Sequence, residues 1–145
     1  MLSRDFKEFV ALLNAHGVEY LVVGGYAMAL HGRPRHTGDL DVWLKRNPDN
    51  AKRIIGALEA FGFGGVGLSE GDFLKGDHVV QLGYPPFRID LLTDIDGVDF
   101  DAAWPNRQTF VHDGLALHFI GLDDLKANKR ASGRARDLDD LEQLP

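Results

Sequence analysis

Apolar residues recur at helical spacing near the start of the chain and then give way to a short β-rich run. Positions 6, 9, 10 and 13 are apolar and Ser3 is a good N-cap residue, so a helix is predicted that ends at His16-Gly17. Residues 19–23 predict a buried strand, which stops at the pair Gly24-Gly25. The compact segment 26–30, rich in Ala, Met and Leu, then predicts a short helix that begins directly after the two glycines.

A period-two alternation marks residues 39–44 as a second strand. One face of this strand carries Leu40, Val42 and Leu44, and the other carries Asp39, Asp41 and Trp43. The preceding residues 33–38 contain Pro and Gly and are expected to form a loop. Two carboxylates therefore project from one face of a strand, directly after a loop.

Caps, turns and helix breakers define the remaining elements. They are a helix from Asn47-Pro48 to Phe61, strands at Val79–Leu82 and Phe87–Leu92, a hairpin turning at Asp113-Gly114, a helix over Leu122–Ser132 ending at Gly133, and a final helix capped by Asp137. This order predicts an α/β (α+β) fold, with a mixed β-sheet flanked by helices in a single domain over residues 1–145.

Composition narrows the class of protein and the kind of metal site. The chain has 145 residues, 44% hydrophobic and 26% charged, as in an ordinary globular protein. No apolar run approaches the roughly 18 residues that span a bilayer, and the first residues lack a signal peptide, so a cytoplasmic protein without a membrane partner is expected. Cysteine is absent from the sequence, so a metal would be held by oxygen or imidazole, which favours a hard cation.

The net charge of −6 argues against indiscriminate nucleic-acid binding, because such proteins neutralise phosphates with a basic surface. A local basic stretch nevertheless remains, comprising Lys126, Lys129, Arg130, Arg134 and Arg136. If the protein acts on RNA, this stretch should form one surface with the functional cleft.

Three carboxylates are the candidates for chemistry. Asp39 and Asp41 lie about 7 Å apart along one strand and face the same way, close enough to converge on one cation. Asp90 lies on the face of its strand opposite Ile89 and Leu91, and it could join them in one cleft if the two strands are neighbours. Two structural alternatives stay open: a solvated sheet face for Asp39 and Asp41, and a simple ion pair of Asp90 with Arg88 or a lysine.

The pair Gly24-Gly25 is a candidate phosphate-binding element, since glycine lets backbone amides approach a ligand at a helix start. Lys129 has two interpretations: it could reach a triphosphate, or it could pair with Asp137, and the pairing is favoured. Arg35 and Thr37, just before the carboxylate strand, are further candidates for contacting a nucleotide. The alternatives are a solvated charge for Arg35 and a loop-bracing hydroxyl for Thr37.

Two parts of the sequence together resemble the nucleotidyltransferase fold superfamily, which includes DNA polymerase beta and the minimal nucleotidyltransferases. The first is Val23-Gly24-Gly25 followed by Arg35-His36-Thr37-Gly38-Asp39-Leu40-Asp41-Val42. The second, residues 126–141, is similar to the C-terminal portion of the bacterial branch related to abortive-infection and toxin–antitoxin nucleotidyltransferases. Tyr26 departs from the serine that often follows the glycines, which places phosphate binding on the backbone amides.

The resemblance implies an enzyme that moves a nucleoside monophosphate from an NTP to an acceptor hydroxyl of RNA, a protein or a small molecule. Asp39, Asp41 and Asp90 would be catalytic and would hold two ions, Mg²⁺ or Mn²⁺, with Asp90 helping to activate the acceptor. The nucleotide-binding set would comprise Gly24, Gly25, Arg35, Thr37 and Lys129. A cognate protein partner, in a toxin–antitoxin or phage-defence setting, is also implied.

Other motifs and functions carry less weight. The spelling G-x-G-x-x-G at residues 62–67 follows a predicted helix instead of a strand and is expected to be a loop. The six histidines have no metal-ligand spacing. Two competing functions are a non-catalytic, antitoxin-like binding module of the same fold and a metal-dependent phosphohydrolase using the same carboxylates.

Overall fold

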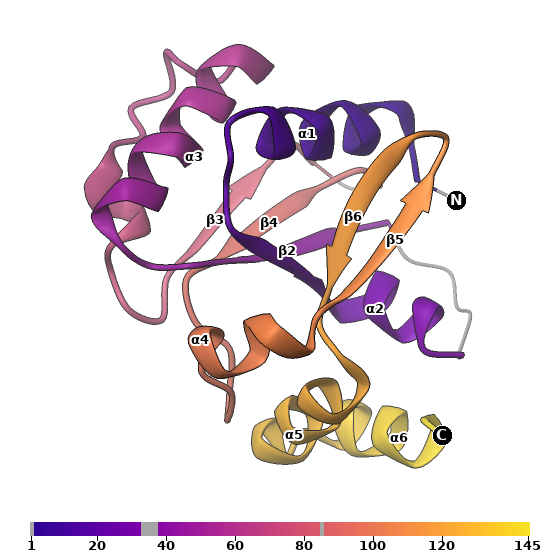
Figure 1. Ribbon diagram of the computed structural model, residues 1–145. Helices are drawn as coiled ribbons and strands as arrows, with labels where there is room; N and C mark the ends of the chain where they lie inside the picture. The colour runs from indigo at the N-terminus through magenta and orange to yellow at the C-terminus, as the bar shows by residue number, and fades with distance from the viewer. Residues whose placement is uncertain (1, 33–37, 85) are drawn as a thin grey trace.

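The computed structural model describes residues 2–32, 38–84 and 86–145, which fold around one six-stranded sheet (Figure 1). Its strands are β1 (Tyr20–Val23), β2 (Leu40–Leu44), β3 (Val79–Leu82), β4 (Ile89–Leu92), β5 (Gln108–His112) and β6 (Leu115–Phe119), in the order β3-β4-β2-β1-β6-β5. The pairs β2–β4 and β1–β6 are parallel and the other three pairs are antiparallel. The predicted mixed sheet and α/β class are therefore confirmed.

The helices begin and end largely where the sequence signals place them. They are α1 (Arg4–Ala15), α2 (Gly24–Leu30), α3 (Pro48–Phe61), α4 (Phe100–Ala103), α5 (Leu122–Ser132) and α6 (Ala135–Gln143), with 3₁₀ turns at Glu70–Phe73 and Trp104–Asn106. The side chain of Ser3 accepts a hydrogen bond from the Phe6 amide, and that of Asn47 accepts one from the Asn50 amide, so both predicted N-caps are confirmed.

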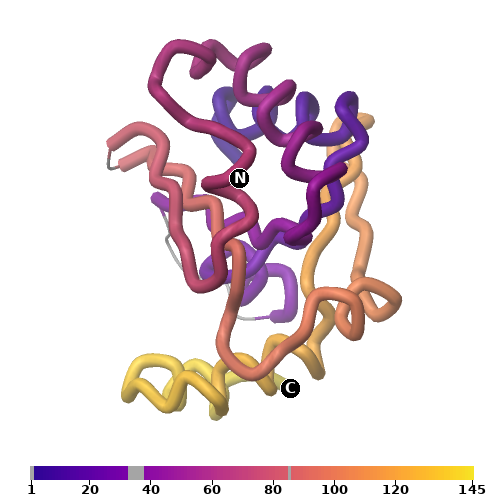
Figure 2. The backbone as a smooth tube through the Cα atoms, turned by 90° about the vertical axis from the view of Figure 1, so that its left-hand side faces the viewer, coloured from indigo at the N-terminus to yellow at the C-terminus, as the bar shows by residue number. Residues whose placement is uncertain are grey.

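Two helical layers lie on opposite sides of the sheet. Helices α1 and α3 lie on one side and α5 and α6 on the other, as the two perpendicular views show (Figures 1 and 2). The strand face with Leu40, Val42 and Leu44 is buried in the main core. On the opposite face Trp43 is also buried, because Phe100 of α4 packs edge-to-face against it with ring centroids 5.0 Å apart. The face that carries the carboxylates is therefore only partly open to solvent.

Three predicted boundaries are wrong in detail. Helix α2 begins at Gly24 itself instead of after the glycines. Strand β4 begins at Ile89, and Phe87 lies before it with its side chain exposed. Helix α6 has Arg134 at its N-cap position, and Asp137 lies inside the first turn, because its carboxylate binds cationic and hydroxyl groups of the preceding residues instead of the helix amides.

The described part of the chain contains no helix that is both long and apolar enough to cross a membrane. The glycine-rich residues 62–67 form a loop after α3, as expected.

Candidate active site

The two predicted carboxylate strands are neighbours. Asp41 of β2 and Asp90 of β4 are direct partners across the parallel pair β2–β4. Val23 of β1 is the next partner of Asp41, and Gln81 of β3 is the next partner of Asp90, so four side chains form one row across the sheet. Asp39 precedes β2 and lies on the same face by alternation. All three carboxylates line one cavity of about 650 Å³, which confirms the condition on which their joint role depends.

Asp41 is the carboxylate with the most perturbed environment. Burial, the neighbouring charge of Asp90, a side-chain hydrogen bond with Asp90 and the charge of Asp39 raise the pKa of Asp41 to about 7, and Arg88 partly offsets them. A carboxyl group with such a pKa is destabilised in its ionised form, here by burial and by the negative charges beside it. The cluster therefore favours either a proton or an added cation at this point.

Arg88, which directly precedes β4, bridges the other two carboxylates. Its Nε donates to Asp90 Oδ1 at 2.9 Å, while its Nη2 donates to Asp90 Oδ2 at 3.1 Å and to Asp39 Oδ2 at 3.0 Å. This is a two-pronged guanidinium–carboxylate pair with a third bond across to the next strand. The predicted ion pair between Asp90 and Arg88 is therefore present, and it occurs within the carboxylate cluster.

Among the residues that the structure describes, no three carboxylate or imidazole side chains are arranged as a ready metal centre. Arg88 binds the carboxylates of Asp39 and Asp90, whereas Asp41 shares a hydrogen bond with Asp90. The assignment of Asp39, Asp41 and Asp90 as joint metal ligands consequently stays a prediction.

Gly24 leaves the space that the Asp41 carboxylate occupies. The residue has a φ of +69°, and a Cβ built there would lie 2.1 Å from Asp41 Oδ2. Only glycine both adopts this left-handed backbone without strain and leaves room for the carboxylate. Gly24 and Gly25 line the same cavity, so the start of α2 and the carboxylates border one space.

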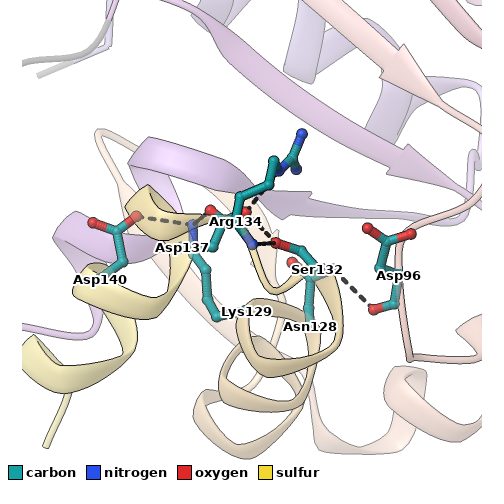
Figure 3. Close-up of polar contacts among 7 residues, drawn as sticks. All are labelled: Asp96, Asn128, Lys129, Ser132, Arg134, Asp137 and Asp140. Carbon is teal, nitrogen blue, oxygen red and sulfur yellow. Dashed lines mark hydrogen bonds and ion pairs between the residues drawn. The ribbon is translucent and has the colours of Figure 1, made fainter.

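Helices α5 and α6 form the opposite wall of the cavity, to which they contribute Asn128, Lys129, Arg134, Arg136 and Asp137. Asn128 donates a hydrogen bond to the Asp96 carbonyl at 2.9 Å, which ties α5 to the segment after β4 (Figure 3). Gly97 lets α5 approach, because a Cβ there would lie 2.3 Å from the Ala131 Cβ. This wall brings exposed positive charge, from Arg134 and Arg136, to an otherwise acidic cavity.

Lys129 is buried and makes two ion pairs inside this wall. Its Nζ lies 3.0 Å from Asp137 Oδ1 and 3.0 Å from Asp140 Oδ2, and its residue exposure is only 6% (Figure 3). Burial alone would raise the pKa of Asp137, but hydrogen bonds from Ser132, Lys129 and Arg134 lower it to about 2. The favoured pairing of Lys129 with Asp137 is present, and a role in nucleotide binding would compete with it.

Arg35 and Thr37 lie outside the described residues, so their predicted contacts with a nucleotide stay predictions. Sequence reasoning missed the central position of Arg88. Arg88 lies two residues before Asp90, and a residue at that spacing on a strand shares its face, which was the available signal. The basic stretch was expected beside the cleft only for a protein that acts on RNA, and three of its residues, Lys129, Arg134 and Arg136, border the cavity.

Comparison with solved structures gives the same fold at low identity. The chain superimposes with a TM-score of 0.64 on a protein of Thermotoga maritima described as a candidate nucleotidyltransferase, with 16% identity over 97% of this chain and 89% of that one. The antibiotic-resistance factor ANT(2'')-Ia gives a TM-score of 0.58 at 10% identity over 95% of this chain and 79% of that one. An antigenic nucleotidyltransferase-like protein from Paracoccidioides brasiliensis gives 0.55 at 16% identity, over 97% and 76% of the two chains.

Comparison with curated proteins gives no match. Residues 2–144 match the profile of the family described as "Nucleotidyltransferase of unknown function (DUF6036)". That match covers almost the whole sequence and agrees with both the fold and the resemblance of the glycine and aspartate motifs. The chain therefore belongs to the DUF6036 family of the nucleotidyltransferase fold superfamily.

Proposed function

We propose that this protein transfers a nucleoside monophosphate from an NTP to an acceptor hydroxyl with the help of a divalent cation. The observation that carries the proposal is the register of Asp41 and Asp90 on adjacent parallel strands, with Asp39, two residues before Asp41, lining the same cavity. Membership of the family supports the reaction class. The roles of the individual residues rest on the geometry of the cavity.

The donor set of the cavity fits a hard cation. Three carboxylates line it, and burial together with the charges of Asp90 and Asp39 raises the pKa of Asp41 to about 7, which a bound cation would counteract. Mg²⁺ and Mn²⁺ prefer carboxylate oxygens and keep positions for phosphate oxygens. Asp39, Asp41 and Asp90 would hold the ions once Arg88 releases the oxygens of Asp39 and Asp90.

The reaction forms a bond from the acceptor oxygen to the α-phosphorus and breaks the bond from that phosphorus to the oxygen of the departing pyrophosphate. Asp90 would orient the acceptor hydroxyl and take its proton. Two bound divalent ions would supply charge neutralisation for the α-phosphate and the leaving group. The work left to the protein is positioning, because phosphoryl transfer asks for little covalent chemistry from side chains.

The triphosphate would lie between the two walls of the cavity. Gly24 and Gly25 border it on one side, where the backbone is free of Cβ atoms, and Arg134 and Arg136 border it on the other. Guanidinium groups bind phosphate oxygens in pairs, so this wall would take the β- and γ-phosphates. Lys129 would contribute indirectly, since its ammonium is already bound by Asp137 and Asp140.

The acceptor remains RNA, a protein hydroxyl or a small molecule. Of the basic stretch near the C-terminus, Lys129, Arg134 and Arg136 border the cavity, and Lys129 is neutralised there by two carboxylates. Among the described residues, the positive surface that borders the cavity is therefore small, which favours a compact acceptor over a long RNA. A solved structure of the same fold contains ANT(2'')-Ia in complex with adenylyl-2''-tobramycin, a small molecule that carries an adenylyl group. At 10% identity this likeness suggests only what to test first.

The test is a labelling experiment with the purified protein, each of the four α-³²P-labelled NTPs, Mg²⁺ or Mn²⁺, and a cell extract. The extract is then separated into RNA, protein and small-molecule fractions. Wild type is compared with Asp39→Ala and Asp41→Ala, and Glu142→Ala, an exposed carboxylate on α6, serves as the matched control. We expect label in one fraction with wild type and the control, and loss of at least about a hundredfold with the two aspartate variants.

Two other results would redirect the assignment. Nucleotide binding without any labelled acceptor, together with partner binding that survives Asp41→Ala, would identify the non-catalytic module of the same fold. Release of free nucleoside monophosphate without transfer would identify the phosphohydrolase. Equal labelling by wild type and Asp41→Ala would refute the assigned site.

A further inference from the structure

Arg88 extends a partly exposed side chain into the carboxylate cavity. Its side chain is 27% exposed, yet three of its N–H groups bind the carboxylates of Asp39 and Asp90 at 2.9 to 3.1 Å. The backbone of Arg88 is fixed independently, because its carbonyl accepts a hydrogen bond from the Leu40 amide at 2.9 Å. The guanidinium can therefore move while the strand register stays intact.

The oxygens that Arg88 holds are those that a divalent cation would need. Both oxygens of Asp90 and one oxygen of Asp39 accept hydrogen bonds from it. Mg²⁺ must approach such oxygens to about 2.1 Å, and its double charge would be repelled by a guanidinium on the same groups. The guanidinium therefore occupies the same three carboxylate oxygens that an ion bound between Asp39 and Asp90 would use.

We propose that Arg88 is a built-in counter-ion of the carboxylate cluster that competes with the divalent metal for Asp39 and Asp90. In the metal-free protein it holds the acidic strands together against their mutual repulsion. Metal entry requires the guanidinium to release at least the Asp39 oxygen, which lies on the other strand. This proposal rests on the proposed function for the metal site, and it assigns Arg88 a positioning role instead of a catalytic one.

The released side chain has space to occupy. Besides the carboxylate cavity, Arg88 also borders a second hollow of about 650 Å³, on the β3 side of the sheet. Tyr84, which is 86% exposed, lines that hollow and offers an aromatic face to a guanidinium. The competition can therefore operate by a swing of one side chain.

The test measures metal binding directly, without nucleotide. Mn²⁺ affinity is determined by the electron paramagnetic resonance signal of free Mn²⁺ for wild type, Arg88→Met, Arg88→Lys and Arg46→Met. Arg46 is the matched control, because it is a nearby arginine that pairs with Asp94 at 3.3 Å and touches none of the three carboxylates in its described contacts. We expect Arg88→Met to bind Mn²⁺ at least about tenfold more tightly than wild type, since a positive charge leaves the site. Arg88→Lys should lie between them, and Arg46→Met should match wild type.

A second measurement follows metal binding in the unaltered protein and uses a variant only to assign the signal. The Arg88 Nε–H is hydrogen-bonded to Asp90, and its ¹H–¹⁵N signal, assigned by its loss in Arg88→Lys, is followed during titration with Mg²⁺ alone. The signal should move toward that of a solvent-exposed arginine as the metal saturates. An unmoved signal at saturation, or Mn²⁺ affinity in Arg88→Met that is equal to or weaker than in wild type, would overturn the proposal.

The outcomes separate this inference from the proposed function. If wild type transfers nucleotide and binds Mn²⁺ but Arg88→Met binds no more tightly, only the role of Arg88 fails. If Mn²⁺ displaces Arg88 yet no acceptor is ever labelled, the role of Arg88 stands and the transfer activity fails. If no metal binds to either protein, both fail together.

Discussion

Lys129 offers the sharpest test of how the cavity wall is built. In Lys129→Met the apolar stem is retained but the ammonium is removed, which leaves Asp137 and Asp140 in a buried place without the cation that lies 3.0 Å from each. Breaking a buried ion pair by removal of one partner typically costs about 3–5 kcal/mol. Because Asp137 keeps its bonds from Ser132 and Arg134, we expect the lower end, about 3 kcal/mol, or about 10 °C in Tm for a chain of this size.

Urea unfolding followed by circular dichroism measures this loss. Lys126→Met is the control, since Lys126 lies on the same helix and binds only the carbonyl of Pro145 in its described contacts, so less than about 1 kcal/mol is expected. Adding Asp140→Asn to Lys129→Met should recover part of the stability, because the double variant buries one carboxylate fewer without the Lys129 ammonium. A loss below about 1 kcal/mol, combined with a raised KM for NTP, would refute the structural role and make Lys129 a nucleotide ligand.

Three further predictions concern the cavity. The pKa of Asp41 is about 7 in the folded protein against an ordinary 3.8, so the folded state binds the extra proton between these values and stability falls as pH rises through that window. Asp41→Asn should therefore match wild type near pH 4 in a melting experiment and exceed it at pH 8, and equal curves at both would contradict the assignment. Gly24→Ala should lose about 2 kcal/mol or more by chemical denaturation, against about 1 kcal/mol for Gly133→Ala, which shares the positive φ but has open space. Replacing Arg134 and Arg136 together by Gln should weaken NTP binding about tenfold or more in calorimetry while leaving Tm nearly unchanged, and unaltered affinity would remove them from the triphosphate site.

The sequence predicted the elements that depend on local signals. Three of these signals each span only a few residues of the sequence, and all three are confirmed. They are the alternation around Asp39–Leu44, the cap at Asn47 and the Asp-Gly hairpin. The favoured ion pair of Lys129 with Asp137 also held. The pairing of the strands that carry Asp41 and Asp90 was only a condition for a joint role of the carboxylates, because strand order is set by contacts distant in sequence, and the structure fulfils that condition.

What escaped prediction depends on docking between elements. The sequence places Trp43 on the same strand face as the carboxylates but does not show which residue packs against it. The contact with Phe100 explains why Trp43 is buried. Arg88 was considered as a simple partner of Asp90, yet its second bond reaches Asp39 across the β2–β4 pair. Asp137 was expected both to cap the last helix and to pair with Lys129, and the structure shows the pair, joined by Arg134, without the cap.

The close approach of residue 24 to the Asp41 carboxylate has a consequence for the evolution of the family. A side chain at position 24 and a carboxylate at position 41 cannot occupy the same space, so the two positions cannot drift independently. Relatives that have gained any larger residue at the first of these positions should have shortened or lost the acid at the second. Such paired changes would identify members that have given up the acid, and with it the metal site proposed here, while keeping the fold.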